Sequence, residues 1–230
     1  MRKRIIVALD FDRFEVARSF VEKLKEAEFY KVGLQAFMKY GPDILKFLKE
    51  RKKSVFLDLK FKDIPNTVFW AVKSSMIYEP EFLSIHLSGG REMIKKAVLA
   101  AQDAYNMKIL GVSVLTSLND NDLFETGVEI GMEESVMKLC GLGIDSGLNS
   151  FVCSPHEVRE LKDKFGDSIT VVSPGIRPKW AAKADQKRVF TPRQAIDAGS
   201  DYLVIGRPIT ASKDPEGAFR VILNELVLQR

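Results

Sequence analysis

Eight short apolar segments, rich in β-branched and aromatic residues, alternate with amphipathic segments along the whole chain. The strand-like segments lie at residues 5–9, 29–34, 54–60, 82–87, 109–115, 150–154, 169–173 and 202–206. Helical patterns lie between them, for example at residues 14–27, 42–50, 67–78, 92–105, 155–165 and 192–198. Strands that alternate with helices predict a parallel sheet with helical crossovers.

The number of these units indicates that the sheet closes on itself. Eight strand–helix units in 230 residues fit a (β/α)8 TIM barrel, which is an α/β fold. An open doubly wound sheet would carry a glycine-rich dinucleotide loop after its first strand, whereas Asp10-Phe11-Asp12 stands there. No linker or change of composition interrupts the pattern. We therefore expect one (β/α)8 barrel domain spanning residues 1–230.

Charge and cysteine content argue against several classes of protein. Lysine and arginine are interleaved with acidic residues and the net charge is only +4, so we expect no nucleic-acid partner. The apolar segment at residues 5–9 is too short for a signal peptide, and no segment approaches membrane-spanning length. Two cysteines are too few for a secreted disulfide framework. We expect a cytoplasmic protein without a membrane partner.

The third strand-like segment carries charges on its inward face. Strand alternation places Phe56, Asp58 and Lys60 on one face, and Leu57 and Leu59 on the other. The leucines suit packing against the outer helices, so Asp58 and Lys60 are expected to point into the barrel mouth, where barrel enzymes carry their chemistry. Buried charges are unfavourable unless they are paired. The pair is a catalytic candidate, and a purely structural ion pair is the alternative.

Neighbouring strands end in further charged residues. Asp10 ends the first strand, Lys31 lies on the second, and Asp63 follows Lys60 by three residues. The alternative for Asp63 is the N-cap of the next helix, which has Pro65 in its first turn. A set of alternating acids and bases would nearly neutralise itself and hold each charge in place before a substrate binds.

Uncharged polar residues also fall at strand ends. Ser84 and His86 share one face of the fourth strand, and Thr116 and Ser117 end the fifth. The two histidines, His86 and His156, do not form a metal site, and we interpret His86 as a core histidine. We find no ligand set for a metal and no motif for a cofactor.

The last two strands both end in glycine and arginine. Gly206-Arg207 ends the eighth strand, and Pro174-Gly175-Ile176-Arg177 follows the seventh. The loops after strands seven and eight of a barrel often bind phosphate through backbone N–H groups, to which arginine adds bidentate contacts. The alternative for each motif is a turn with a solvated arginine. The poorly patterned stretch at residues 178–191 predicts a lid.

Taken together, these residues resemble the orotidine 5′-monophosphate decarboxylase family over essentially the whole chain. The motifs that carry the resemblance are Val7-Ala8-Leu9-Asp10, Lys31-Val32-Gly33, Phe56-Leu57-Asp58-Leu59-Lys60-Phe61-Lys62-Asp63-Ile64-Pro65-Asn66-Thr67, Val114-Leu115-Thr116-Ser117, Pro174-Gly175-Ile176-Arg177-Pro178 and Ile205-Gly206-Arg207-Pro208-Ile209-Thr210. The resemblance implies cofactor-free and metal-free decarboxylation of orotidine 5′-monophosphate in pyrimidine biosynthesis, by a homodimer with shared active sites.

The resemblance also implies a role for each charged residue. Lys60 would donate a proton to C6 of the pyrimidine, and Asp58 would lie against the substrate carboxylate. Lys31 and Asp63 would complete the charged network. Asp63, accompanied by Thr67, would reach into the active site of the neighbouring subunit.

The remaining implied residues would bind the substrate. Asp10 and Lys31 would hold the ribose hydroxyls, and Thr116 and Ser117 would meet the pyrimidine edge. The phosphate end of the substrate would be bound by Pro174, Arg177, Gln186, Gly206 and Arg207, with Gln186 on the lid. This sequence departs from many members at Lys62, where they have His, and in a lid with little glycine.

Two other functions stay open on the residues alone. A metal-dependent relative with a similar Asp-x-Lys-x-x-Asp strand would be a sugar-phosphate decarboxylase or an aldolase of formaldehyde and a pentulose phosphate. Such enzymes need further acidic ligands, and the segment at residues 64–67 resembles the nucleotide enzyme instead. The second alternative is a non-enzymatic binder of a phosphorylated ligand on the same barrel.

Overall fold

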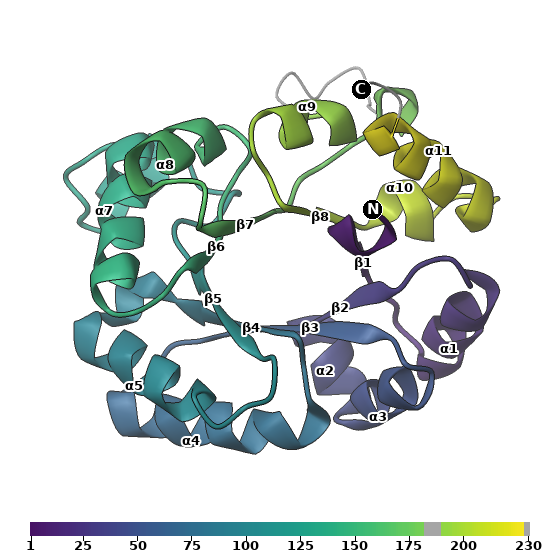
Figure 1. Ribbon diagram of the computed structural model, residues 1–230, viewed down its shortest axis with the longest axis horizontal. Helices are drawn as coiled ribbons and strands as arrows, with labels where there is room; N and C mark the ends of the chain where they lie inside the picture. Colours follow the sequence, from purple (N-terminus) through teal and green to yellow (C-terminus); the bar gives the residue numbers. More distant parts are fainter. Residues whose placement is uncertain (182–189, 228–230) are drawn as a thin grey trace.

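The structure, a computed structural model, describes residues 1–181 and 190–227. It contains a closed parallel barrel in which each strand pairs with its neighbours in sequence and β8 pairs with β1, as Figure 1 shows. The strands are β1 Ile5–Ala8, β2 Phe29–Gly33, β3 Ser54–Phe61, β4 Phe82–His86, β5 Lys108–Val112, β6 Ser150–Val152, β7 Thr170–Ser173 and β8 Tyr202–Ile205. The predicted (β/α)8 barrel is confirmed.

Helices cover the outside of the barrel (Figure 1). They are α1 Phe14–Lys23, α2 Leu34–Tyr40, α3 Asp43–Glu50, α4 Pro65–Ser75, α5 Arg91–Ala101, α6 Asp120–Glu125, α7 Met132–Asp145, α8 Val158–Phe165, α9 Pro192–Asp197, α10 Arg207–Thr210 and α11 Pro215–Val227, with short 3-10 turns η1 Arg2–Arg4, η2 Met76–Tyr78, η3 Leu87–Gly89 and η4 Lys179–Ala181. Within the described residues, no helix is both long and apolar enough to cross a bilayer.

Side chains on alternate strand positions build two separate cores. The outward-facing residues pack under the helices, whereas the inward-facing residues form a smaller cluster inside the barrel. The lower part of this cluster is aromatic: the ring of Phe82 lies 5.2 Å from Phe29, 6.1 Å from Phe56 and 5.0 Å from Tyr202 between centroids. These rings fill the barrel near the strands' N-terminal ends, and they separate the polar residues at the opposite end from that side of the barrel.

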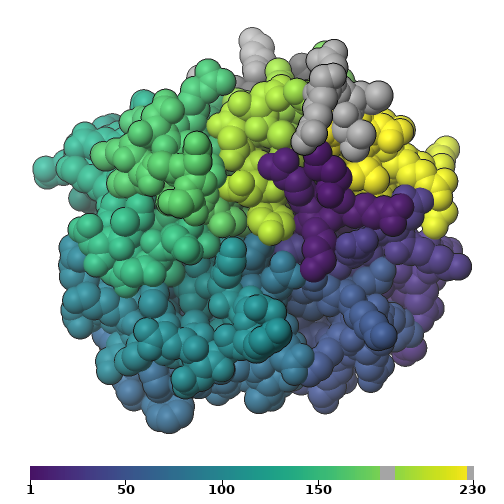
Figure 2. Space-filling view, in the orientation of Figure 1, coloured from purple at the N-terminus to yellow at the C-terminus, as the bar shows by residue number. Residues whose placement is uncertain are grey.

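The N-terminal face of the barrel is the one that Figures 1 and 2 present to the viewer. The N-terminal residues, purple in the space-filling view, lie across the front of the molecule there. The turns that lead from helices into strands share this face, because every strand of the barrel runs in the same direction.

Strand β3 has an irregularity beside its charged residues. Its pairing with β4 joins Leu57 to Leu83 and Phe61 to Ile85, so four residue steps on β3 oppose two on β4. Lys60 lies within this bulge and has a left-handed backbone with φ of 51°. Residues with side chains seldom adopt that conformation, and outliers of this kind cluster at functional sites. Simple strand alternation therefore ends at Asp58.

A half-buried carboxyl group, that of Glu157 at the N-cap of α8, makes stability dependent on pH. Burial raises the pKa of Glu157 from 4.5 to about 7. The folded protein therefore favours the protonated carboxyl, and this contribution is complete below about pH 4.5 and lost as the pH rises through about 7.

We expect Glu157→Gln to be more stable than the wild type at pH 8, by about 2 kcal/mol after allowance for partial solvation, and nearly equal to it at pH 4.5. Urea unfolding at both pH values measures this difference. Exposed Glu129→Gln is the matched control and should show no such dependence on pH. An equal effect of Glu157→Gln at both pH values would contradict the prediction.

Candidate active site

A chain of alternating charges lines the mouth of the barrel. Lys60 Nζ lies 2.7 Å from Asp58 Oδ1, and Lys31 Nζ lies 3.7 Å from Asp58 Oδ2. Lys31 Nζ also lies 3.3 Å from Asp10 Oδ1. The structure therefore brings together four of the predicted residues, from β2, β3 and the loop after β1, and Asp58 is the acid that both lysines share. Because β1 ends at Ala8, Asp10 follows the first strand rather than ending it.

The burial of these side chains decreases from the centre of the chain outward. The side chains of Asp58 and Lys31 are 11% and 13% exposed, whereas those of Lys60 and Asp10 are 28% and 51% exposed. A carboxylate buried to this degree is stable because two cations and a hydroxyl accompany it. Lys60 keeps part of its ammonium accessible, so a molecule in the mouth can contact it.

Gly33 makes room for the Lys31 ammonium. A Cβ atom at position 33 would lie 2.7 Å from Lys31 Nζ and 3.5 Å from Asp10 Oδ1. Any side chain there would push the ammonium away from Asp10. The glycine of the Lys31-Val32-Gly33 motif thus has a steric role in assembling the charged chain.

Ser84 joins the charged residues to the neighbouring strand. Its Oγ donates a hydrogen bond to Asp58 Oδ1 at 2.9 Å and accepts one from the backbone N–H of Lys60 at 2.9 Å. The side chain thus fills the gap that the bulge opens between β3 and β4. Sequence reasoning placed Ser84 on the same face of its strand as His86 but did not include it in the site. The signal that could have found it is its position two residues after Phe82, because alternate residues of a strand face the same side and Phe82 faces the inside of the barrel.

We expect Ser84→Ala to lower the free energy of unfolding by about 1–3 kcal/mol, because the Lys60 N–H and Asp58 each lose a buried partner. Urea denaturation measures the change. The control is Ser88→Ala, an exposed serine on η3, which should change stability by less than about 0.5 kcal/mol. A loss no larger than that of the control would show that the bridge is not structural.

His86 lies at the inward end of β4, beside the charged chain. It is half-buried rather than enclosed in a core, and this corrects our interpretation of it as a core histidine. Burial lowers its pKa, and the charges of Lys60 and Lys62 lower it further. The imidazole is therefore neutral at physiological pH. The contribution of Lys62 shows that its ammonium lies near enough to act on the mouth electrostatically.

Asp63 and Thr67 remain outside the charged chain of their own subunit. Both are exposed, and Asp63 Oδ1 accepts a hydrogen bond only from the adjacent Ile64 N–H, at 2.7 Å, among the described residues. The N-cap of α4 is Ile64, which makes no side-chain cap. The alternative interpretation of Asp63 as a helix cap is therefore wrong.

Thr116 and Ser117 do not end a strand. Strand β5 stops at Val112, and both residues are exposed in the connection that leads to α6. A turn in which the Leu118 N–H donates to the Leu115 carbonyl at 3.0 Å interrupts the apolar run there. The predicted strand at residues 109–115 is therefore too long, and these two hydroxyls belong to a loop above the mouth.

The two glycine–arginine motifs follow β7 and β8, which are paired strands. Gly175 follows Pro174 and adopts a φ of +78°, which a residue with a side chain seldom does. Arg177 is half-buried and its backbone N–H donates to the Phe190 carbonyl at 2.9 Å. Gly206 is the N-cap of α10 and Arg207, its first residue, is exposed. Gln186 and most of the predicted lid lie outside the described residues.

Within the described residues, no group of three His, Cys, Asp or Glu side chains is placed to hold a metal ion. The acids of the mouth, Asp10 and Asp58, are each engaged with a lysine. What the mouth offers is a fixed row of cations and carboxylates with one partly accessible ammonium, beside two arginine-bearing loops.

Comparison with known proteins identifies the family of the chain. A family described as "Orotidine 5'-phosphate decarboxylase / HUMPS family" matches residues 3–222. The chain belongs to this family. The family resemblance predicted from the sequence motifs is therefore confirmed, and it covers nearly the whole barrel.

Individual relatives of the orotidine 5′-phosphate decarboxylase family are similar over their full length. The chain is 43% identical over 225 residues to an orotidine 5′-phosphate decarboxylase of Gloeothece citriformis, and 45% identical over 229 residues to one of Idiomarina loihiensis, with 97% of each chain covered in both cases. A crystal structure of the orotidine 5′-phosphate decarboxylase of Lactobacillus acidophilus matches with a TM-score of 0.85 and 36% identity, covering 96% of this chain and 98% of that one.

Proposed function

We propose that this chain decarboxylates orotidine 5′-monophosphate to uridine 5′-monophosphate in de novo pyrimidine biosynthesis, without a cofactor. The observation that carries the proposal is the Lys60 ammonium held 2.7 Å from a buried carboxylate at the barrel mouth, in a member of this family. We propose that it acts in the cytoplasm.

The chemistry requires a cation at one fixed point. When the bond between C6 and the carboxylate carbon breaks, its electron pair stays on C6 in the plane of the ring, where the π-system cannot absorb it. The Lys60 ammonium stabilises this charge as it develops and then donates a proton to C6. Asp58 and Lys31 hold the ammonium in position before the substrate arrives, so little reorganisation is needed during the reaction. Solvent returns the proton to Lys60.

The other groups bind the parts of the substrate that do not react. Asp10 and Lys31 hold the ribose hydroxyls, Thr116 and Ser117 meet the pyrimidine edge, and the phosphate lies between the loops after β7 and β8. The residues proposed for the phosphate end are Pro174, Arg177, Gln186, Gly206 and Arg207. Contacts remote from C6 supply binding energy that favours closure over the substrate and the transition state.

The proposed enzyme is a homodimer that shares its active sites. Asp63 and Thr67 are exposed, and Asp63 makes no ion pair with the charged chain of its own subunit among the described residues, so each is available to a second copy. Ile64, beside Asp63, and Trp70 on α4 are large hydrophobic side chains that are exposed, as are Leu34 and Met38 on α2. Met38 is 79% exposed and Ile64 is 66% exposed, and side chains of this kind favour burial against a partner.

Turnover of orotidine 5′-monophosphate is expected to survive EDTA unchanged. In the proposed reaction the lysine ammonium has the role that the metal ion would have in a metal-dependent relative, because it is the cation that stabilises the negative charge developing on the substrate. The measurement is the ultraviolet absorbance change of the substrate with and without millimolar EDTA, after dialysis against the chelator. Restoration of a lost rate by Mg²⁺ would favour the metal-dependent alternative and count against the proposal.

A further inference from the structure

A cavity of about 880 Å³ opens at the N-terminal end of the barrel, opposite the charged mouth. Its wall includes the first residues of β3, β4, β5 and β8, which are Ser54, Phe82, Lys108 and Tyr202. The aromatic rings inside the barrel separate it from Asp58. Its volume suits a small organic molecule, and no step of the proposed decarboxylation uses it.

Three turns around this cavity have an unfavourable backbone conformation. Lys52, Glu79 and Asn106 precede β3, β4 and β5, and their φ angles are 54°, 50° and 72°. The corresponding turns before β6, β7 and β8 use Gly147, Gly166 and Gly199, at φ of 95°, 84° and 108°. Left-handed backbone is unfavourable for residues that have a side chain. The turns before β3, β4 and β5 adopt it nevertheless, and their three polar side chains line the cavity.

The charges around the cavity leave an excess of lysine. Five lysines and three acidic residues line it. Glu79 pairs with Lys49 at 2.7 Å, Glu81 pairs with Lys3 at 3.7 Å, and Asp103 pairs with Lys73 outside the cavity.

Two lysines of the cavity wall, Lys52 and Lys108, make no ion pair among the described residues, whereas Lys53 is engaged by carbonyl groups. The Lys53 ammonium donates to the backbone carbonyls of Lys25 and Ala27. Lys52 and Lys108 have no carboxylate within ion-pair distance among the described residues. The cavity therefore favours an anion.

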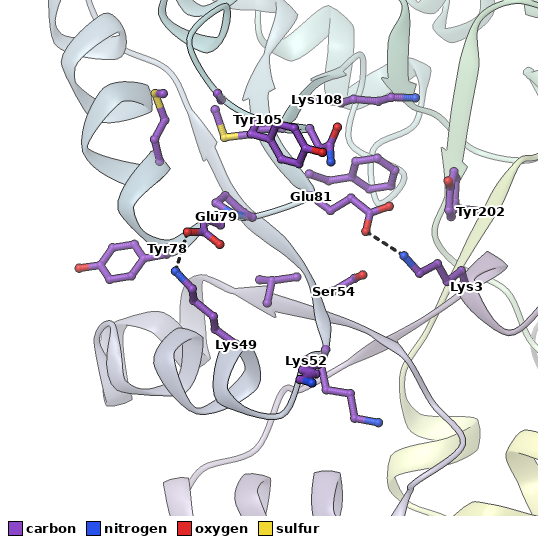
Figure 3. A pocket seen from close by; sticks show the side chains of 18 of the residues that line it. Lys3, Lys49, Lys52, Ser54, Tyr78, Glu79, Glu81, Tyr105, Lys108 and Tyr202 are labelled. Atoms are coloured by element: carbon purple, nitrogen blue, oxygen red, sulfur yellow. Dashed lines mark hydrogen bonds and ion pairs between the residues drawn. The ribbon is translucent and has the colours of Figure 1, made fainter.

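The remaining wall is suited to a flat ring. Tyr105 is 93% exposed at the rim, and Met76 and Met107 offer polarisable side chains that adapt to an aromatic surface. Figure 3 shows Tyr105 and Lys108 on one side of the cavity, with Lys49 and Lys52 on the other. An anionic group that lies in the cavity between Lys52 and Lys108 would thus have Tyr105 on one side, where a ring attached to the group can contact it.

We propose that this cavity is a second ligand site, which binds a small aromatic or heteroaromatic anion. Lys52 and Lys108 contact the anionic group, and Tyr105 and the methionines contact the ring. The site is independent of the mouth, because the two lie at opposite ends of a filled barrel.

The test uses the aromatic sulfonate anilinonaphthalene sulfonate as the probe, followed by its fluorescence on binding to the full chain. The test variant is Lys52→Ala/Lys108→Ala. The control is Lys95→Ala/Lys138→Ala, which removes the same charge from exposed helix lysines. We expect saturable binding by the wild type, at least about tenfold weaker binding by the test variant, and less than about twofold change in the control.

A second variant, Tyr105→Ala, tests the ring contact separately from the charge. We expect it to weaken probe binding while a purely inorganic anion, sulfate, competes equally with the probe in this variant and in the wild type. Absence of saturable binding by the wild type, or equal affinity of the wild type and the Lys52→Ala/Lys108→Ala variant, would overturn the proposal.

Discussion

Lys60→Ala is expected to lower turnover of orotidine 5′-monophosphate by at least about 10³-fold, while binding of uridine 5′-monophosphate stays measurable. The variant loses both the cation that stabilises the carbanion and the proton donor. The contacts of the ribose and phosphate lie elsewhere and remain. Steady-state absorbance assays give the rate, and calorimetric titration with the product gives the affinity.

The control for this experiment is Lys62→Ala, which removes an exposed ammonium two residues away. It should retain most of the activity, because Lys62 makes no ion pair with Asp58 and acts on the mouth only through space. Unchanged turnover in Lys60→Ala would refute the catalytic assignment. A wild type that binds the nucleotide without converting it would favour the non-enzymatic alternative.

Mixing inactive Lys60→Ala and Asp63→Ala subunits is expected to restore about a quarter of the wild-type activity. Half of the randomly paired dimers are hybrids, and a hybrid with shared sites has one site that lacks both groups and one that has both. The measurement is the rate after subunit exchange in dilute urea and its removal, compared with each variant treated alone.

A second mixture serves as the control for shared sites. Lys60→Ala and Asp58→Ala affect residues that lie 2.7 Å apart in one subunit, so no hybrid of these two variants contains an intact site. This mixture should stay inactive. If the Lys60→Ala and Asp63→Ala mixture also stays inactive although hybrid dimers are present, Asp63 does not act across the subunit boundary.

Strand periodicity was enough to predict the barrel and the contact between Asp58 and Lys60. Both depend on local patterns: alternation fixes which side chains face inward, and buried charges require partners. Periodicity was not enough to place Lys60 correctly along its strand. The bulge in β3 depends on the pairing with β4 and on Ser84, which is far away in sequence.

The ends of strands were also difficult to predict. The run at residues 109–115 is apolar enough to continue as a strand, but the structure ends it at Val112 and turns the chain at Leu115. Strand length in a barrel is set by the neighbouring strands, and β6 has only three residues to pair with. Thr116 and Ser117 were therefore predicted at a strand end but lie in a loop, because the length of the strand depends on its neighbour β6 and not on their own segment.

The cluster of rings formed by Phe29, Phe56, Phe82 and Tyr202 has a consequence for how molecules enter and leave the site. Because the barrel is closed at this end, any molecule that reaches Lys60 must enter and leave through the mouth. In the proposed reaction the bound nucleotide occupies the mouth, and its phosphate lies nearest to the solvent. Carbon dioxide must therefore either diffuse past the bound nucleotide or leave after the nucleotide has dissociated.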